Sequence, residues 1–233
     1  MSFALRLRSR PRTWQPQVMA NLISAFGVDG AVTAANGVAT AFRNIIGAPF
    51  SVVGGASVTW VISHVGAVIT QSGTNYFSRT RPWALSGSRT FAATLVCGSS
   101  AGAQGVWSVA ASEIVSTPHL LLQRNGTDLR LYAPGTGYVA TFTGVATSGA
   151  ILRVAWGSTN VAASAAGTAY LAVNGQLKKG TYTGGTNSAT NEYLFSGYST
   201  QYLGGIGDFL SMPGCSPALI TDLSMNPWQV FSP

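Results

Sequence analysis

The sequence predicts an all-β fold built as an antiparallel sandwich of two sheets. Only 8% of its 233 residues are charged, whereas long solvated helices need Glu, Lys and Arg on their outer faces. Glycine is abundant, with 28 residues, and Ala, Ser, Thr and Val fill much of the rest, a composition that favours short strands joined by tight turns. Roughly a dozen short apolar segments and one late helical turn are best accommodated in two packed sheets.

Residues 1–20 are predicted to form an extended basic arm. Its arginines alternate with apolar residues at a period of two, so one edge is apolar and the other cationic. Pro11 and Pro16 prevent a continuous helix. The apolar edge needs a dry protein groove, and the arm lacks the interleaved aromatics of single-strand binders, so we expect a protein surface and no specific nucleic acid as its partner. The predicted docking residues are Phe3, Leu5, Arg6, Leu7, Arg8, Arg10, Arg12 and Trp14.

Positive charge is confined to the first two-fifths of the chain. Residues 1–89 hold eight arginines and a single acid, Asp29, whereas residues 90–233 hold five basic and five acidic residues. This asymmetry indicates an electrostatic docking end joined to a neutral body. Because so few charges protect the surface, we also expect a homo-oligomer, with a trimer favoured.

Residues 21–89 are predicted to be rich in strands, as a docking layer or as the first part of the sandwich. The stretch 45–70 carries no formal charge, but Pro49 and several glycines interrupt it. A membrane-spanning segment is not usually so broken, so two or three buried strands are expected and no membrane partner.

Residues 90–233 are predicted to form the main sandwich. Strands are expected at 89–97, around 105–111, and on both sides of Asn125-Gly126 and Asn174-Gly175. Each Asn-Gly pair favours a two-residue hairpin, because these residues readily take positive φ. Near the end, Ser216 can cap a helix that starts at Pro217 and stops before Pro227.

The usual signatures of catalysis are weak, so no enzyme, catalytic residue or cofactor is expected. The six carboxylates are far apart in sequence. Glycan cleavage needs two carboxylates close together in space, so the fold would have to bring together a pair such as Glu113 and Asp208. A G-x-S-x-G pattern at 98–102 lacks the following helix and the required order of Asp and His. His64 and His119 are isolated, the cysteines show no C-x-x-C spacing, and two buried free thiols are expected.

Asp128 and Asp208 each lie in a Gly-containing segment. Each is expected to be an ordinary turn residue, and the alternative is that one of them binds a calcium ion. Aromatic side chains could also provide a sugar-binding platform, although most strand aromatics of a sandwich belong to its core. The candidates for a ligand face are Trp107, Tyr138, Tyr198 and Tyr202.

The C-terminal region resembles a known group of phage proteins. Val173-Asn174-Gly175 is followed by GGIGDFL, by SPALITDLSM and by the terminal Asn226-Pro227-Trp228-Gln229-Val230-Phe231. This series resembles the concanavalin A-like, laminin-G-like jelly rolls encoded by tailed bacteriophages, and the opening SRPRTWQPQ is similar to the Arg-rich starts of such proteins. The resemblance implies a jelly-roll virion component or adhesion module, located in the virion and made in the host bacterial cytoplasm.

Two functions follow as expectations. In the first, a capsid decoration or cement protein docks on the major capsid protein, or another virion protein, through its arginine-rich arm. In the second, a receptor-binding module of a tail fibre or spike recognises a host glycan through its aromatic residues. A glycan hydrolase comes third, because no suitably placed pair of carboxylates is evident.

Overall fold

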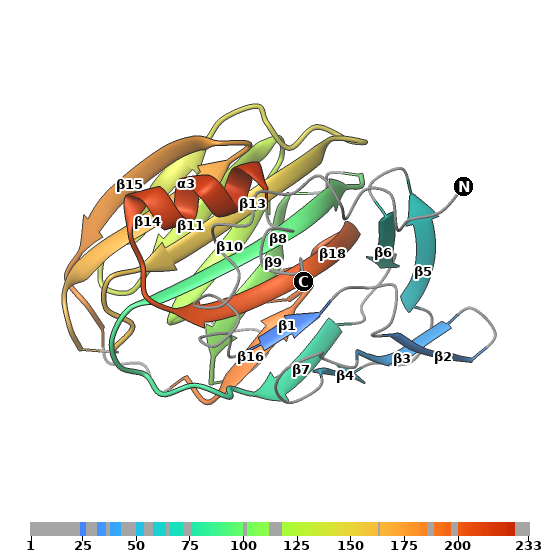
Figure 1. Cartoon of the computed structure of the whole chain (residues 1–233), viewed down its shortest axis with the longest axis horizontal. Coiled ribbons are helices and arrows are strands. Elements are labelled where there is room, and N and C mark those ends of the chain that lie inside the picture. Colours follow the sequence, from blue (N-terminus) through green and yellow to red (C-terminus); the bar gives the residue numbers. More distant parts are fainter. Residues whose placement is uncertain are drawn as a thin grey trace.

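The computed structural model of the chain (Figure 1) describes the strands of a β-sandwich and one helix. The predicted arm lies outside the described residues, and so do Tyr198, the motif serine Ser100 and the C-terminal segment 227–233. The described ranges are 24–26, 32–35, 38–42, 50–53, 58–63, 66–71, 76–99, 102–111, 118–162, 164–185, 189–196 and 200–226.

The first sheet is organised around two long antiparallel neighbours, β8 (Arg89–Cys97) and β18 (Gly204–Pro213). β13 (Ile151–Ser158) pairs with the other edge of β8. β8 is a nearly continuous apolar run, as expected of a strand that is covered on both faces. The other strands are β14 (Gly167–Val173) and β15 (Gln176–Tyr182) beyond β13, and β1 (Ser24–Phe26), β6 (Gly66–Gln71) and β5 (Val58–Ser63) beyond β18.

The second sheet is centred on β9 (Ala103–Ala110), which pairs with β10 (Leu120–Asn125) and β16 (Asn191–Leu194). Burial alternates strictly along β11 (Asp128–Ala133), the neighbour of β10, so one face of this hairpin is in the core and the other points outward. The other strands are β12 (Gly137–Phe142) beyond β11, β7 (Tyr76–Thr80) and β4 (Phe50–Val53) beyond β16, and β17 (Thr200–Gln201), which runs parallel to β9.

Strands from residues 21–89 pair directly with strands from residues 90–233. β6 and β1 pair with β18, and β7 pairs with β16. β3 (Val38–Phe42) pairs with β4 of the second sheet and with β5 of the first, while β2 (Val32–Ala35) pairs with β3. β1, β6 and β7 of residues 21–89 are therefore hydrogen-bonded to strands of residues 90–233.

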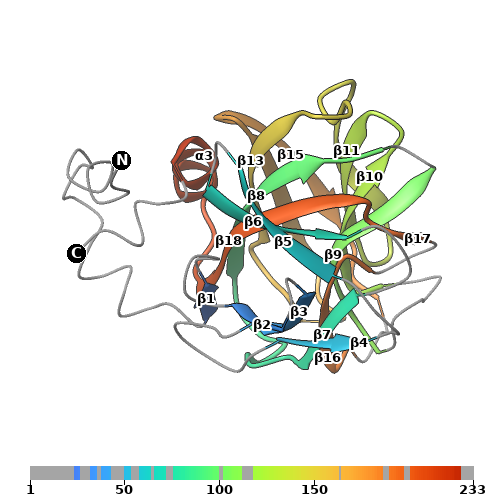
Figure 2. The same cartoon turned by 90° about the vertical axis from the view of Figure 1, so that its right-hand side faces the viewer.

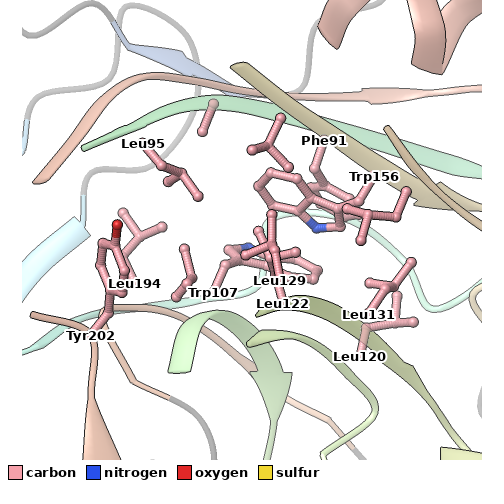
Figure 3. Packing of buried hydrophobic residues seen from close by; sticks show 14 of the residues in the cluster. Phe91, Leu95, Trp107, Leu120, Leu122, Leu129, Leu131, Trp156, Leu194 and Tyr202 are labelled. Atoms are coloured by element: carbon pink, nitrogen blue, oxygen red, sulfur yellow. The ribbon is translucent and has the colours of Figure 1, made fainter. Parts of the chain in front are cut away.

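An aromatic core fills the space between the sheets. Trp107 of β9 faces Phe91 of β8 and Trp156 of β13, with ring centroids 4.4 and 5.3 Å away. Figure 3 shows these rings meeting above leucines from β10 and β11. Phe209 extends the contact series to Phe50, with centroids 6.0 Å apart. Such edge and tilted packing adds specific geometry to a large buried apolar area.

A buried ion pair anchors β7 and β16 to the core. Arg79 and Glu192 are cross-strand partners, and their side chains are 2% and 0% exposed. Arg79 Nε and Nη2 donate to Glu192 Oε2 at 2.8 and 2.6 Å, while Trp107 Nε1 donates to Oε1 at 2.8 Å. The Arg79 guanidinium carbon also lies 4.0 Å from the Phe50 ring centroid. Both carboxylate oxygens therefore have donors, which is the condition under which a buried charge is tolerated.

The predicted C-terminal helix is confirmed as α3 (Pro217–Met225), with Ser216 as its N-cap and Pro217 at its first position. Figure 2 shows it on the outside of the sandwich, and its Ile220 and Leu223 pack in a second apolar cluster. The rest of this cluster is on the outer side of the first sheet, where several alanines let the helix approach closely. Its members from the sheet are Ala92, Ala155, Tyr170, Ala172, Leu210 and Met212.

The hairpin at Asn174-Gly175 is confirmed, with φ of 49° and 86° at its two turn residues. Gly175 N–H donates to Ser224 Oγ of α3 at 3.0 Å, and a Cβ on Gly175 would come within 2.8 Å of Met225. The glycine is thus needed for its positive φ, whereas the exposed Met225 side chain could move to make room for a Cβ.

The other hairpin differs from the prediction by one residue. Asn125 pairs with Asp128, so the turn residues are Gly126 and Thr127 rather than Asn125 and Gly126. Gly126 alone supplies the positive φ, at 61°, and Asn125 remains in the strand. The shift moves the register of β10 on β11 without changing which side chains face outward.

Both cysteines are free, as predicted; Cys97 is buried and Cys215 is partly buried. Burial raises the pKa of the Cys215 thiol to about 11. No helix among the described residues is long and apolar enough to cross a membrane.

Replacing Glu192 tests the buried pair. Glu192→Gln leaves the Arg79 charge buried without its counter-charge, so we expect a loss of about 3–5 kcal/mol in the free energy of unfolding. Asp128→Asn, at the more exposed pair with Arg130, should cost below about 1 kcal/mol. Urea denaturation measures both. Equal losses in the two variants would contradict this role, whereas the double change Arg79→Met and Glu192→Leu should recover part of the stability, because it removes both buried charges but leaves the Trp107 indole N–H without its acceptor.

His119 gives the fold a pH dependence. The ring is 1% exposed, and Nε2 lies 2.8 Å from the Val161 carbonyl oxygen, so Nε2 carries the proton of the neutral ring. Burial lowers the pKa of His119 from 6.5, and the Arg81 charge lowers it further, although the bond to Val161 opposes both. The unfolded chain therefore binds a proton at higher pH than the folded chain does.

The free energy of unfolding should consequently fall as pH drops below about 6.5, and the His119 contribution should stop changing below the lowered folded pKa. His119→Gln, which keeps an N–H donor for Val161, should reduce this slope. Urea denaturation at about pH 7.5 and about pH 5 measures it. If the free energy of unfolding depends on pH equally in the variant and in the parent protein, His119 is not the source of this pH dependence.

Candidate ligand-binding face

The outward side of β10, β11 and β12 carries a group of polar and aromatic side chains, which we call the β10–β12 face. The alternation of β11 sends Leu129 and Leu131 into the core and leaves the intervening residues outward. Register places Gln123 opposite Arg130, Asn125 opposite Asp128, and Tyr132 opposite both Leu121 and Tyr138. The members of the face are Gln123, Asn125, Asp128, Arg130, Tyr132 and Tyr138.

Tyr138 is the most prominent side chain of this face. It is 41% exposed, although its hydroxyl donates to Gln123 Oε1 at 2.6 Å. Its ring lies edge-on to Tyr132, with centroids 5.8 Å apart at 80°, and the Arg130 guanidinium carbon lies 5.5 Å from its centroid. These contacts hold the ring in one orientation while leaving part of it open to solvent.

Arg130 links the aromatic residues to a polar network. Its Nη2 donates to Asp128 Oδ2 at 3.0 Å, and Gly144 N–H donates to Asp128 Oδ1 at 3.1 Å. With the Asn125 amide oxygen turned toward it, Arg130 also donates to that oxygen from Nη1 and Nη2, at 2.9 and 3.1 Å. The hydrogen bond from Arg130, followed by that from Gly144, lowers the pKa of the Asp128 carboxyl. The face therefore holds a charge pair with little net charge.

Two donors at this face have no hydrogen-bond partner in the part of the chain that the structure describes. They are Nε2 of Gln123, a side chain that is 1% exposed, and the buried Nε of Arg130. Buried donors normally find acceptors, so these two nitrogens are the unsatisfied polar groups of the face.

The structure separates the sequence-predicted ligand-face residues. Tyr138 is on the surface as expected, and Tyr198 lies outside the described residues. Trp107 is fully buried, because it occupies an inward position of β9 and its indole N–H binds Glu192. Tyr202 is also fully buried; it stacks on Phe195 and its hydroxyl donates to the Val96 carbonyl at 2.8 Å. Neither Trp107 nor Tyr202 is available to a ligand in this structure.

The carboxylates of the described ranges do not gather into a metal site. No group of three or more His, Cys, Asp and Glu side chains gathers there. Asp128, one of the two candidates for calcium, instead binds N–H donors through both oxygens. Asp208 lies at a bulge of β18, where its side chain is not described, and Glu113 is outside the described residues. Glu192 is enclosed in the core.

The sequence analysis missed Gln123 and Arg130 as members of a ligand face. The hairpin pattern could have indicated Arg130, because any two-residue turn near Asn125 puts Arg130 on the outward side of β11 with Asp128 and Tyr132. The predicted register would have paired Gln123 with Asp128 rather than with Arg130. The docking residues proposed for the arm, Phe3 to Trp14, lie outside the described residues.

Comparison with family models and with curated protein sequences finds no match. Solved structures are similar at low identity. Domain 4 of AbnA, a GH43 extracellular arabinanase from Geobacillus stearothermophilus in complex with arabinotriose, matches with a TM-score of 0.63 and 13% identity, covering 88% of this chain and 98% of that one. A Trypanosoma rangeli sialidase matches with a TM-score of 0.63 and 11% identity over 89% of this chain and 33% of its own.

The binding domain of botulinum neurotoxin serotype D matches with a TM-score of 0.59 and 8% identity, over 91% of this chain and 53% of its own. This chain thus spans about a third of the sialidase and about half of the toxin domain. At such identities the likeness concerns the fold. Together with the strand order, it shows that the chain is a jelly-roll β-sandwich with a short C-terminal helix, as the sequence predicted.

Proposed function

We propose that this chain is a non-enzymatic glycan-binding module that uses the β10–β12 face. The observation that carries the proposal is the half-open Tyr138 ring, held by Gln123 and flanked by the Arg130–Asp128 pair. A sugar presents an apolar C–H face and a ring of hydroxyls. An aromatic ring beside fixed donors and acceptors complements both features at once.

The polar groups of the face suit hydroxyl recognition rather than recognition of a charged group. Asp128 can accept from a hydroxyl, and the partly exposed Arg130 guanidinium can donate to one. Because the Arg130–Asp128–Asn125 contacts already hold these side chains, little side-chain entropy remains to be lost on binding. A neutral or weakly charged sugar is therefore the ligand that fits this face best.

The structural comparisons support the proposal at the level of the fold. One similar domain belongs to an arabinanase and is described in complex with arabinotriose, and another similar structure is a sialidase. A non-catalytic role is supported by the positions of two carboxylates. Glu192 is sealed in the core and Asp128 is held by Arg130, so neither is placed as a free general acid or nucleophile.

Tyr138→Ala tests the site, because it removes the platform from an exposed position where folding should be little affected. We expect glycan binding found for the parent protein on an array to weaken by at least roughly tenfold in titration calorimetry. Tyr138→Phe keeps the ring and loses only the hydroxyl, so it should retain much of the affinity. The control is Lys179→Ala, on the exposed part of β15. Sugar binding that survives Tyr138→Ala unchanged would refute the assignment of this face.

A virion role stays a second proposal, carried by the confinement of positive charge to residues 1–89. In this role the arm attaches the module to a virion protein, either on the capsid as a decoration protein or on a tail fibre or spike, where the module would bind a host glycan. The arm and the β10–β12 face use separate residues, so attachment and glycan recognition are compatible.

Deleting residues 1–17 tests the attachment. The shortened protein should fold and keep its sugar binding but no longer cosediment with phage particles that lack the native protein. Binding of the full chain should be saturable and weaker at high salt, because it depends on arginines. Unchanged cosedimentation of the shortened protein would exclude the arm as the docking element.

A further inference from the structure

A second group of side chains gathers at the end of the sandwich where the chain passes from β7 to β8. Arg81 and Arg89 both lie beside the buried indole of Trp83, with guanidinium carbons 4.9 and 5.6 Å from a centroid of its ring system. Trp83 in turn packs on Phe91 of the core, with centroids 5.6 Å apart. We call Arg81, Trp83 and Arg89 the Arg81–Arg89 cluster.

This cluster has donors without acceptors. Nε and Nη1 of Arg89 and Nε1 of Trp83 are buried, and none has a hydrogen-bond partner in the described part of the chain. Arg81 uses its Nε to bind the Ala189 carbonyl at 3.2 Å. Guanidinium and indole nitrogens can only donate, so the cluster offers N–H groups and no acceptor of its own.

The cluster also has positive charge without a contacting acid. Among the described residues, the ion pairs are Arg79–Glu192 and Arg130–Asp128, and neither includes Arg81 or Arg89. Glu192 influences Arg81 electrostatically, but its oxygens are already bound by Arg79 and Trp107. Burial lowers the pKa of Arg89, and the positive charge of Arg81 lowers it further. The positive charges of Arg81 and Arg89 therefore lie close together in a partly buried environment.

Solvent can reach this end of the molecule. Pro82, Ala84, Ser86 and Gly87 in the connection from β7 to β8 are exposed, and the two arginines are partly exposed. A ligand could therefore approach Arg81 and Arg89 from outside while Trp83 forms the wall toward the core.

We propose that the Arg81–Arg89 cluster is a binding site for an oxyanion, a carboxylate or sulfate group. Arg81 and Arg89 present guanidinium N–H groups close together with no contacting acid among the described residues, and such groups form charge-assisted hydrogen bonds with carboxylate and sulfate oxygens. The ligand charge would also relieve the repulsion between the two arginines. This inference goes beyond the proposed function, since the cluster shares no residue with the β10–β12 face.

Sulfate titration of the full chain tests the site, with sodium chloride at equal ionic strength as the reference. We expect sulfate to raise the melting temperature above that reference and to bind in calorimetry. Arg89→Gln should weaken binding by roughly tenfold or more, and Arg89→Lys, which keeps the charge but has fewer donors than a guanidinium, should be intermediate. Arg153→Gln is the control, because Arg153 is exposed and binds the Met225 carbonyl.

A stability measurement separates a binding role from a structural one. In chloride alone, Arg89→Gln should be as stable as the parent protein or more stable, because it removes an unpaired buried charge. A marked loss of stability in chloride would overturn the proposal, since it would make Arg89 a structural residue. Failure of both sulfate and glucuronate to bind the parent protein would also overturn it.

Glucuronate and glucose distinguish the sources of the oxyanion. Binding of glucuronate but not glucose, lost in Arg89→Gln, would support an acidic sugar as the carrier of the group. Sulfate binding without glucuronate binding would support a tetrahedral inorganic or ester anion. Equal binding of either anion to Arg89→Gln and to the parent protein would refute the site.

Discussion

The buried bonds of Glu192 are the constraint around which the second sheet is arranged. They tie together β7 through Arg79, β16 through Glu192 itself and β9 through Trp107. Because the carboxylate is fully enclosed, any shift in the register of these strands would leave a charge or an indole N–H unpaired in the core. The register of the sheet is thereby fixed at its centre, and the aromatic core is built on the same Trp107.

This arrangement determines which surfaces are left for recognition. The inward faces of both sheets are used by the core, and α3 covers part of the outer side of the first sheet. The outward side of β10–β12 has no such covering helix among the described elements, and it carries the exposed Tyr138. The two-residue hairpin between β10 and β11 presents Gln123 and Arg130 as neighbours on that side. Here a rigid core supports a pre-arranged surface.

Local rules predicted the elements well and the site only in part. The strand at 89–97, the Asn174-Gly175 turn and the Ser216-capped helix depend on a few neighbouring residues, and all are confirmed. The role of Trp107 depends on Glu192, which is 85 residues away along the chain. Sequence patterns do not report such contacts, so an inward tryptophan was indistinguishable from a ligand-facing one. Tyr138 could be proposed because it follows a glycine turn at a strand start, but its partner Gln123 required the exact hairpin register.

The arginines of the β7–β8 region show why net charge alone does not locate a docking surface. Three of the eight arginines in residues 1–89 are Arg79, Arg81 and Arg89, which belong to the sandwich rather than to the arm. Arg79 is buried with its counter-charge and serves the fold. Arg89 lies ten positions later in the sequence and close to the positive charge of Arg81. Its buried N–H donors have no hydrogen-bond acceptor among the described residues. Buried donors without acceptors are unusual in folded proteins, so this difference in pairing supports the anion site proposed at Arg81 and Arg89. Of the three sandwich arginines, Arg79 is neutralised by Glu192, whereas Arg81 and Arg89 keep their positive charge without a contacting acid among the described residues.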